Sequence, residues 1–169
     1  MKIVLLGYMA SGKSAVGKIL AQRLKMQFFD LDEYIEESEK LTISQIFSDK
    51  GEIYFRKKES EYLKELLNLE ENCIISLGGG TPCYGNNMDI VLEKSKSFYL
   101  NASVQTIFNR IKSETSKRPL VATIGIENLL EYIGKHLFER SAFYNKAHKS
   151  ISVNDKSILE IVKELQSLL

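Results

Sequence analysis

The sequence predicts an α/β fold in which helices cover a parallel β-sheet, and three observations support this prediction. Short apolar runs alternate with longer segments whose apolar residues recur at helical spacing, a pattern typical of βαβ units. A glycine-rich segment at 7–14 joins the first apolar run directly to the first helical pattern. The chain has 169 residues and shows no linker or repeat, so we expect residues 1–169 to form a single domain.

Five apolar runs are expected to form the strands, and helical patterns lie between them. The strands are predicted at 2–7, 27–30, 73–77, 97–100 and 149–153. The helices are predicted at about 13–25, 52–68, 86–94 and 103–114. Thr42 and Gln45 form a capping-box pattern at the start of another helix. Asp155 is expected to cap the last helix, which carries an apolar stripe.

Residues 114–126 depart from this regular alternation. They contain Arg118-Pro119 and Gly125 and show no clear period. A loop of this length in a compact domain usually serves function, so the segment is predicted to be a lid.

Composition excludes several classes of protein. The net charge of +1 provides no basic field for nucleic acid. Cys73 and Cys83 have no metal-binding spacing, which fits a reduced compartment. The first apolar run begins at residue 2 and leaves no room for a signal peptide, and no run has the length of a membrane span. We therefore expect a cytoplasmic protein that binds neither nucleic acid nor membrane.

Residues 7–14 match the pattern GxxxxGKS of a phosphate-binding loop. Backbone N–H groups of such a loop surround polyphosphate oxygens, with help from the helix dipole. Lys13 can reach the β- and γ-phosphates, and the Ser14 hydroxyl can bind Mg²⁺. The alternative is a simple glycine turn with a solvated lysine. The ATP-binding residues expected here are Gly7, Ala10, Ser11, Gly12, Lys13, Ser14 and Ala15.

Two carboxylates end the second predicted strand, in the segment FFDLD at 28–32. Alternate residues of a strand share a face, so Asp30 and Asp32 can both point toward the carboxyl edge of the sheet. One can hold Mg²⁺, and the other can accept a proton from a substrate hydroxyl. The alternative for Asp32 is that it caps the following helix.

Three consecutive glycines, Gly78, Gly79 and Gly80, follow the third predicted strand. They permit close approach of the backbone to a small ligand, although a tight turn would need only one or two of them. Arginine suits the bidentate binding of carboxylate or phosphate, and each single arginine could equally be a surface charge. The four candidates are Arg56, Arg110, Arg118 and Arg140.

Taken together, these segments resemble the shikimate kinase family over nearly the whole chain. The resemblance rests on GYMASGKS at 7–14, FDLD at 29–32, FRKKE at 55–59, LGGGT at 77–81, RPL at 118–120 and ERSAFY at 139–144. It implies a three-layer P-loop kinase fold with a five-stranded parallel sheet in the order 2-3-1-4-5. It also implies a shikimate-binding subdomain at 31–61 and a lid at 114–126.

The resemblance implies an activity, which is ATP-dependent phosphorylation of the 3-hydroxyl of shikimate in chorismate and aromatic amino acid biosynthesis. Lys13, Asp32 and Arg118 are then catalytic, and Mg²⁺ is held by Ser14 and Asp30. Arg110 lies beside the adenine, and Arg118 also contacts ATP. The implied partners are shikimate and ATP, with a monomer expected. The implied shikimate-binding residues are Asp32, Arg56, Gly78, Gly79, Gly80 and Arg140.

Two other functions stay open from the sequence. One is a different small-molecule kinase of the same fold, with gluconate or a nucleoside monophosphate as the acceptor. The other is a non-catalytic nucleotide-sensing domain, against which the presence of Lys13, Ser14, Asp30 and Asp32 argues.

Overall fold

The strands form one parallel sheet. The computed structural model describes residues 1–114 and 119–169, and of residues 119–121 the backbone alone. Within these residues the sheet has five strands in the order β2-β3-β1-β4-β5. The predicted fold class and strand order are therefore confirmed. The strands are β1 (Lys2–Leu6), β2 (Gln27–Asp30), β3 (Cys73–Ser76), β4 (Lys96–Asn101) and β5 (Lys149–Ser152).

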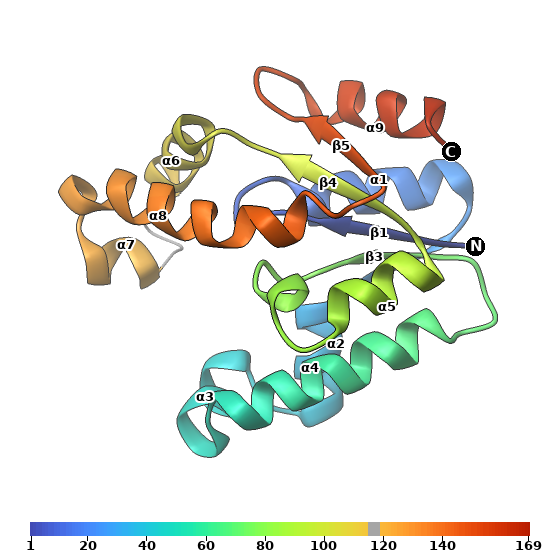
Figure 1. The fold of residues 1–169 in the computed structure, drawn as a ribbon, viewed down its shortest axis with the longest axis horizontal. Coiled ribbons are helices and arrows are strands. Elements are labelled where there is room, and N and C mark those ends of the chain that lie inside the picture. The colour runs from blue at the N-terminus through green and yellow to red at the C-terminus, as the bar shows by residue number, and fades with distance from the viewer. Residues whose placement is uncertain (115–118) are drawn as a thin grey trace.

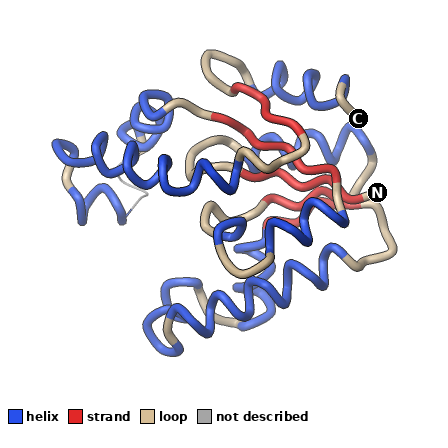
Figure 2. Tube along the Cα trace, viewed as in Figure 1, coloured by secondary structure: helices blue, strands red, loops and turns tan. Residues whose placement is uncertain are grey.

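Helices cover both faces of this sheet, which lies as a central layer (Figure 2). Helix α1 packs against β2, β3 and α9 on one face, and α5 packs against β4 on the other (Figure 1). The helices are α1 (Lys13–Leu24), α2 (Leu31–Glu39), α3 (Ile43–Lys50), α4 (Glu52–Leu67), the 3-10 helix η1 (Thr81–Cys83), α5 (Asn87–Lys94), α6 (Val104–Ser113), α7 (Pro119–Ile124), α8 (Ile126–Tyr144) and α9 (Ile158–Ser167).

The central strands are buried along their length. Ile3, Val4, Leu5 and Leu6 of β1 are fully buried, as are the residues of β3. A continuous apolar run, rather than an alternating one, is typical of a parallel strand that is covered on both faces. The core therefore holds the sheet rigid beneath the loops that leave its carboxyl edge.

Three of these loops begin at nearly the same level. Ser76 of β3 is in register with Leu5 of β1 and with Asp30 of β2. The chain segments that follow β1, β2 and β3 therefore start side by side. In an open α/β sheet this edge is where ligands bind.

The prediction of an irregular loop over 114–126 is wrong in part, because α7 lies within it. Pro119 begins this helix, where its fixed φ angle suits the first helical position and its missing N–H is not needed. Gly125, with φ of 79°, then separates α7 from α8. Whether the segment moves as a lid stays a prediction.

The predicted cap of the last helix is also wrong, whereas the predicted capping box of Thr42 and Gln45 is confirmed. Ser157 caps α9, and its hydroxyl accepts a hydrogen bond from the N–H of Glu160. Asp155 lies two residues too early and has φ of 54°, in the left-handed region. Its side chain therefore cannot follow the geometry of an N-cap, which requires extended backbone.

No helix among the described residues is long and apolar enough to span a bilayer.

The cap at α9 generates a stability prediction. Ser157→Ala should lower the free energy of unfolding by about 1 kcal/mol, because the N–H of Glu160 loses its acceptor. Asp155→Asn is the matched control, since Asn also tolerates the left-handed region. Urea unfolding of both variants would measure the difference. A larger loss in Asp155→Asn than in Ser157→Ala would mean that the cap is misassigned.

Candidate active site

The phosphate loop joins β1 to α1. Gly7 has φ of 148°, and a Cβ atom there would lie 2.7 Å from the carbonyl oxygen of Leu100, so only glycine fits. Nζ of Lys13 donates to the carbonyl oxygens of Gly7 (2.9 Å) and Tyr8 (3.0 Å). The ammonium group is therefore held against the loop, at the positive end of α1.

Asp30 and Ser14 form an oxygen pair at the end of β2. The hydroxyl of Ser14 donates to Oδ2 of Asp30 over 2.5 Å, and Oγ of Ser76 lies 3.4 Å from Oγ of Ser14. Oδ1 of Asp30 accepts hydrogen bonds from the N–H groups of Asp32 and Glu33. Asp30 is thus the N-cap of α2, and the alternative in which Asp32 has this role is wrong.

Asp32 belongs to the first turn of α2, not to the strand, because β2 ends at Asp30. Burial raises the pKa of its carboxyl group from 3.8 to about 6, and the negative charges of Asp30, Glu59 and Glu36 add to this increase, whereas Lys13 opposes it. A carboxylate with a pKa this close to neutrality is a better proton acceptor than an ordinary one. Perturbation of this kind in a cleft is typical of a functional site.

Each of the three consecutive glycines leaves room for one functional side chain. A Cβ atom at Gly78 would lie 2.8 Å from Oδ1 of Asp32, and one at Gly79 would lie 2.9 Å from Nη1 of Arg140. A Cβ atom at Gly80 would lie 2.9 Å from both Nη atoms of Arg56. The sequence predicted that these glycines admit a ligand. In the structure the space beside them holds the side chains of Asp32, Arg140 and Arg56.

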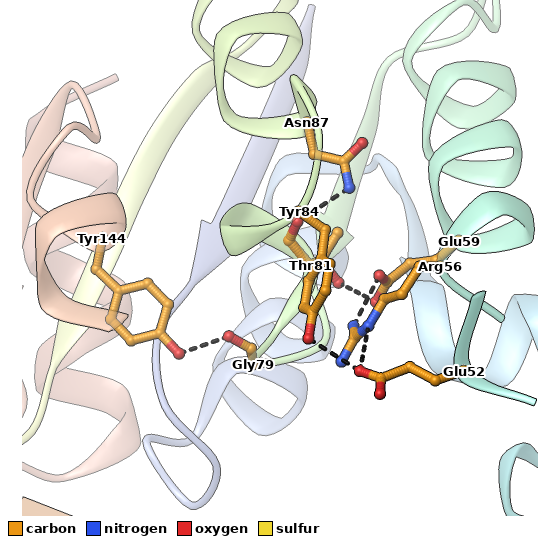
Figure 3. A network of polar contacts seen from close by, with 8 residues as sticks. All are labelled: Glu52, Arg56, Glu59, Gly79, Thr81, Tyr84, Asn87 and Tyr144. Carbon is orange, nitrogen blue, oxygen red and sulfur yellow. Dashed lines mark hydrogen bonds and ion pairs between the residues drawn. The ribbon is translucent and has the colours of Figure 1, made fainter. Parts of the chain in front are cut away.

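Arg56, on α4, belongs to a network of polar contacts whose inner part is buried (Figure 3). Its Nη1 donates to Oε2 of Glu59 over 2.9 Å, and Oε1 of Glu59 accepts from the hydroxyl of Thr81 over 2.6 Å. Glu59 is only 1% exposed. A buried charge is tolerated when it is paired and hydrogen-bonded in this way. The network fixes α4 to the segment that follows the glycines.

The other predicted arginines take different places. Arg140, on α8, lies with its guanidinium carbon 5.8 Å from the centre of the Tyr8 ring. Arg110, on α6, donates to the carbonyl oxygens of Ala10 (2.9 Å) and Val153 (3.4 Å), so it lies beside the phosphate loop. Arg118 lies outside the residues that the structure describes, so its predicted roles stay predictions.

These residues line two cavities. The larger, of about 430 Å³, is lined by the phosphate loop from Ala10 to Val16 together with Arg110. The second, of about 280 Å³, brings together side chains that lie far apart in the sequence. Its lining includes Met9, Asp32, Phe55, Arg56, Glu59, Gly78, Gly79, Gly80 and Arg140. The first cavity thus has the lining of a polyphosphate site, and the second has the lining of a site for a small anion that carries a hydroxyl group.

Several residues of the site were not predicted from the sequence. Glu59 follows Arg56 by three residues on one helix, a spacing that favours an ion pair, so this signal was available. Lys156 lines the larger cavity, and its Nζ donates to Glu164 over 2.6 Å. Nδ1 of His136, on α8, lies 3.0 Å from the hydroxyl oxygen of Tyr8. No local pattern connects residues 128 positions apart.

Comparison with known proteins identifies the family. A family model described as shikimate kinase matches residues 9–169. The chain is also 47% identical to a shikimate kinase of Flavobacterium johnsoniae, over 99% of this chain and 98% of the relative. This chain belongs to the shikimate kinase family. The predicted resemblance and the prediction of an ATP-dependent shikimate kinase are both confirmed at the level of the family.

Solved shikimate kinases share the fold. A structure of the Bacteroides thetaiotaomicron enzyme has a TM-score of 0.92 and 34% identity, covering 99% of this chain and 97% of that one. A structure of the Acinetobacter baumannii enzyme in complex with shikimate has a TM-score of 0.87 and 29% identity, covering 99% and 91%. The P-loop kinase fold is therefore common to this chain and these family members.

The raised pKa of Asp32 generates a prediction for the unliganded protein. Because the folded state holds this proton more tightly than the unfolded state, ionisation costs stability as the pH rises from about 4 to about 6. Asp32→Asn should therefore be more stable than the natural protein at pH 8, by an amount on the order of 3 kcal/mol. This gain should disappear near pH 4, where the aspartate is protonated.

Urea unfolding at both pH values, in the presence of a metal chelator, would measure the gain. Glu33→Gln makes the same chemical change on an exposed residue of the same helix turn and is the matched control. A gain for Asp32→Asn that is equal at pH 4 and pH 8 would contradict the raised pKa.

Proposed function

We propose that this protein transfers the γ-phosphoryl group of ATP to the 3-hydroxyl of shikimate, with the two cavities holding the two substrates. The observation that carries the proposal is the convergence of Asp32, Arg56 and Arg140 beside three glycines, in a cavity next to the phosphate loop. An anionic polyol needs a cationic site for its carboxylate and an acceptor for its reacting hydroxyl, and these residues provide both.

ATP would occupy the larger cavity. The N–H groups of the phosphate loop and the ammonium group of Lys13 would bind its phosphates, and Arg110 would lie on the adenine side. The hydroxyl of Ser14 and the carboxylate of Asp30 fit Mg²⁺, because both supply oxygen ligands and lie side by side at the end of β2. Mg²⁺ commonly takes only one or two protein ligands together with water and phosphate oxygens. When bound, it would neutralise charge on the β- and γ-phosphates.

Shikimate would occupy the smaller cavity. Its carboxylate would lie between Arg56 and Arg140, since planar guanidinium groups match a carboxylate in geometry and charge. Gly79 and Gly80 would leave room beside the carboxylate for the two guanidinium groups, because neither carries a Cβ atom. Its 3-hydroxyl would then face Asp32, at the end of the cavity that borders the phosphate loop.

Catalysis would depend on alignment and on charge. Asp32, with a pKa near 6, would orient the hydroxyl and accept its proton as the oxygen attacks phosphorus. Lys13 would stabilise the negative charge on the transferring group. We assign a similar contribution to Arg118 from the segment 114–126, acting as a lid that excludes water. The monomeric state and the cytoplasmic location stay predictions.

The acceptor preference tests this proposal directly. The purified protein should release ADP from MgATP at a high rate with shikimate, and at a rate at least about a hundredfold lower with gluconate, a nucleoside monophosphate or no acceptor. Phosphorylation at the 3-position should be visible by phosphorus NMR. Faster turnover with gluconate or a nucleotide than with shikimate would overturn the proposal.

Lys13→Ala should lower kcat/KM by at least about a hundredfold, on the order of 3 kcal/mol, because the phosphates lose a positioned charge.

A further inference from the structure

Tyr84 covers one face of the Arg56 guanidinium group. The guanidinium carbon lies 3.9 Å from the centre of the Tyr84 ring, which is within the range of a cation–π contact. Figure 3 shows the two side chains stacked at the end of η1. Tyr84 is not among the residues that line the smaller cavity, which the proposed function gives to the acceptor, whereas Arg56 lines it.

The ring is held in place by its own hydroxyl. Oη of Tyr84 donates to Oε1 of Glu52 over 2.9 Å. The same oxygen atom lies 3.7 Å from Nε of Arg56, one helical turn further along α4. Glu52 thus connects the tyrosine to the helix that carries the arginine.

The backbone that carries Tyr84 is also fixed. Thr81 and Asn87 are fully buried, and the side-chain amide of Asn87 donates to the carbonyl oxygen of Thr81 over 2.9 Å. The N–H of Asn87 donates to the carbonyl oxygen of Tyr84 over 3.2 Å. The tyrosine therefore projects from an anchored turn.

The hydrogen bonds of Arg56 explain what the stacking controls. Nη1 is bound to Glu59, and Nε has no hydrogen-bond acceptor among the described residues. The guanidinium group could still rotate about its hydrogen bond from Nη1 to Glu59 if no side chain lay against its planar faces. A ring 3.9 Å away blocks that rotation and fixes the plane of the group.

We propose that Tyr84 is a positioning residue that sets the plane of the Arg56 guanidinium group for the carboxylate of the acceptor. This inference rests on the proposed function, in which Arg56 binds that carboxylate. Two parallel N–H···O bonds require a correct plane as well as a correct position. Tyr84 should therefore affect the affinity for the acceptor and leave the ATP site and the phosphoryl transfer step unchanged.

Substitution of the ring tests the proposal. Tyr84→Leu should weaken shikimate binding, measured by calorimetry, by about 3- to 30-fold, as expected for the loss of a cation–π contact. The KM for shikimate should rise in parallel, while kcat and the KM for ATP stay within about twofold. Tyr84→Phe keeps the ring, so it should recover most of the affinity and stay within about threefold of the natural protein.

The matched control is Tyr54→Leu. Tyr54 lies on α4, the helix that carries Arg56. The centre of its ring lies 4.6 Å from the ammonium group of Lys50, and its hydroxyl donates to Glu39 over 2.6 Å. It does not line either substrate cavity. The same chemical change there should leave shikimate affinity within about twofold, and thermal unfolding of all variants would show whether each is folded.

A double-mutant cycle with Arg56→Lys shows how Tyr84 acts, because the ammonium group of lysine has no plane to orient. In the Arg56→Lys background, Tyr84→Leu should lower affinity by less than about twofold. If the losses of affinity from Tyr84→Leu and Arg56→Lys were fully additive, the positioning role would be overturned. It would also be overturned if a folded Tyr84→Leu variant bound shikimate as tightly as the natural protein. If Arg56→Lys alone left shikimate affinity unchanged, the part of the proposed function that places the carboxylate at Arg56 would fail, and this result is distinct from the other two.

Discussion

The site depends on one constraint, which is that the three residues after Leu77, close to the end of β3, carry no side chains. Asp32 from α2, Arg140 from α8 and Arg56 from α4 approach Gly78, Gly79 and Gly80 closely enough that a Cβ atom would lie within 3 Å of each. A side chain larger than glycine at any of these positions would displace a group from the acceptor cavity. Because the parallel sheet ends level here, three helices from separate parts of the sequence can converge on one edge.

Two carboxylates at this edge, those of Glu59 and Asp32, lie in different electrostatic surroundings. Glu59 is buried but bound to Arg56 and Thr81, so it acts as a fixed counter-charge that orients the arginine. Asp32 lies nearby, and burial together with the charges of Asp30 and Glu59 raises the pKa of its carboxyl group against the opposing charge of Lys13. The environment therefore assigns a structural, hydrogen-bonded carboxylate to α4 and a proton-accepting one to α2.

Much of this arrangement could be predicted from the sequence, because it follows from local patterns. The five strands, the loop that joins β1 to α1 and the capping box at Thr42 are short-range signals, and the structure confirms them. The errors arose where two short-range signals compete. Asp155 and Ser157 are both good capping residues, and only the backbone angles distinguish them. Asp30 rather than Asp32 caps α2 because the strand ends one residue before the helix begins. The stacking of Tyr84 on Arg56 joins residues 28 positions apart, and no periodicity predicts such a contact.

The central claim is that Arg56 and Arg140 recognise the carboxylate of the acceptor. The most direct measurement is the affinity of the natural protein for shikimate and for its carboxamide, a neutral analogue of the same shape, by calorimetry at one pH and salt concentration. A carboxylate bound by two guanidinium groups should bind at least about tenfold more tightly than the amide, since charge-assisted hydrogen bonds are the stronger ones. Equal affinity for the acid and the amide would contradict the claim, because the arginines would then not recognise a negative charge.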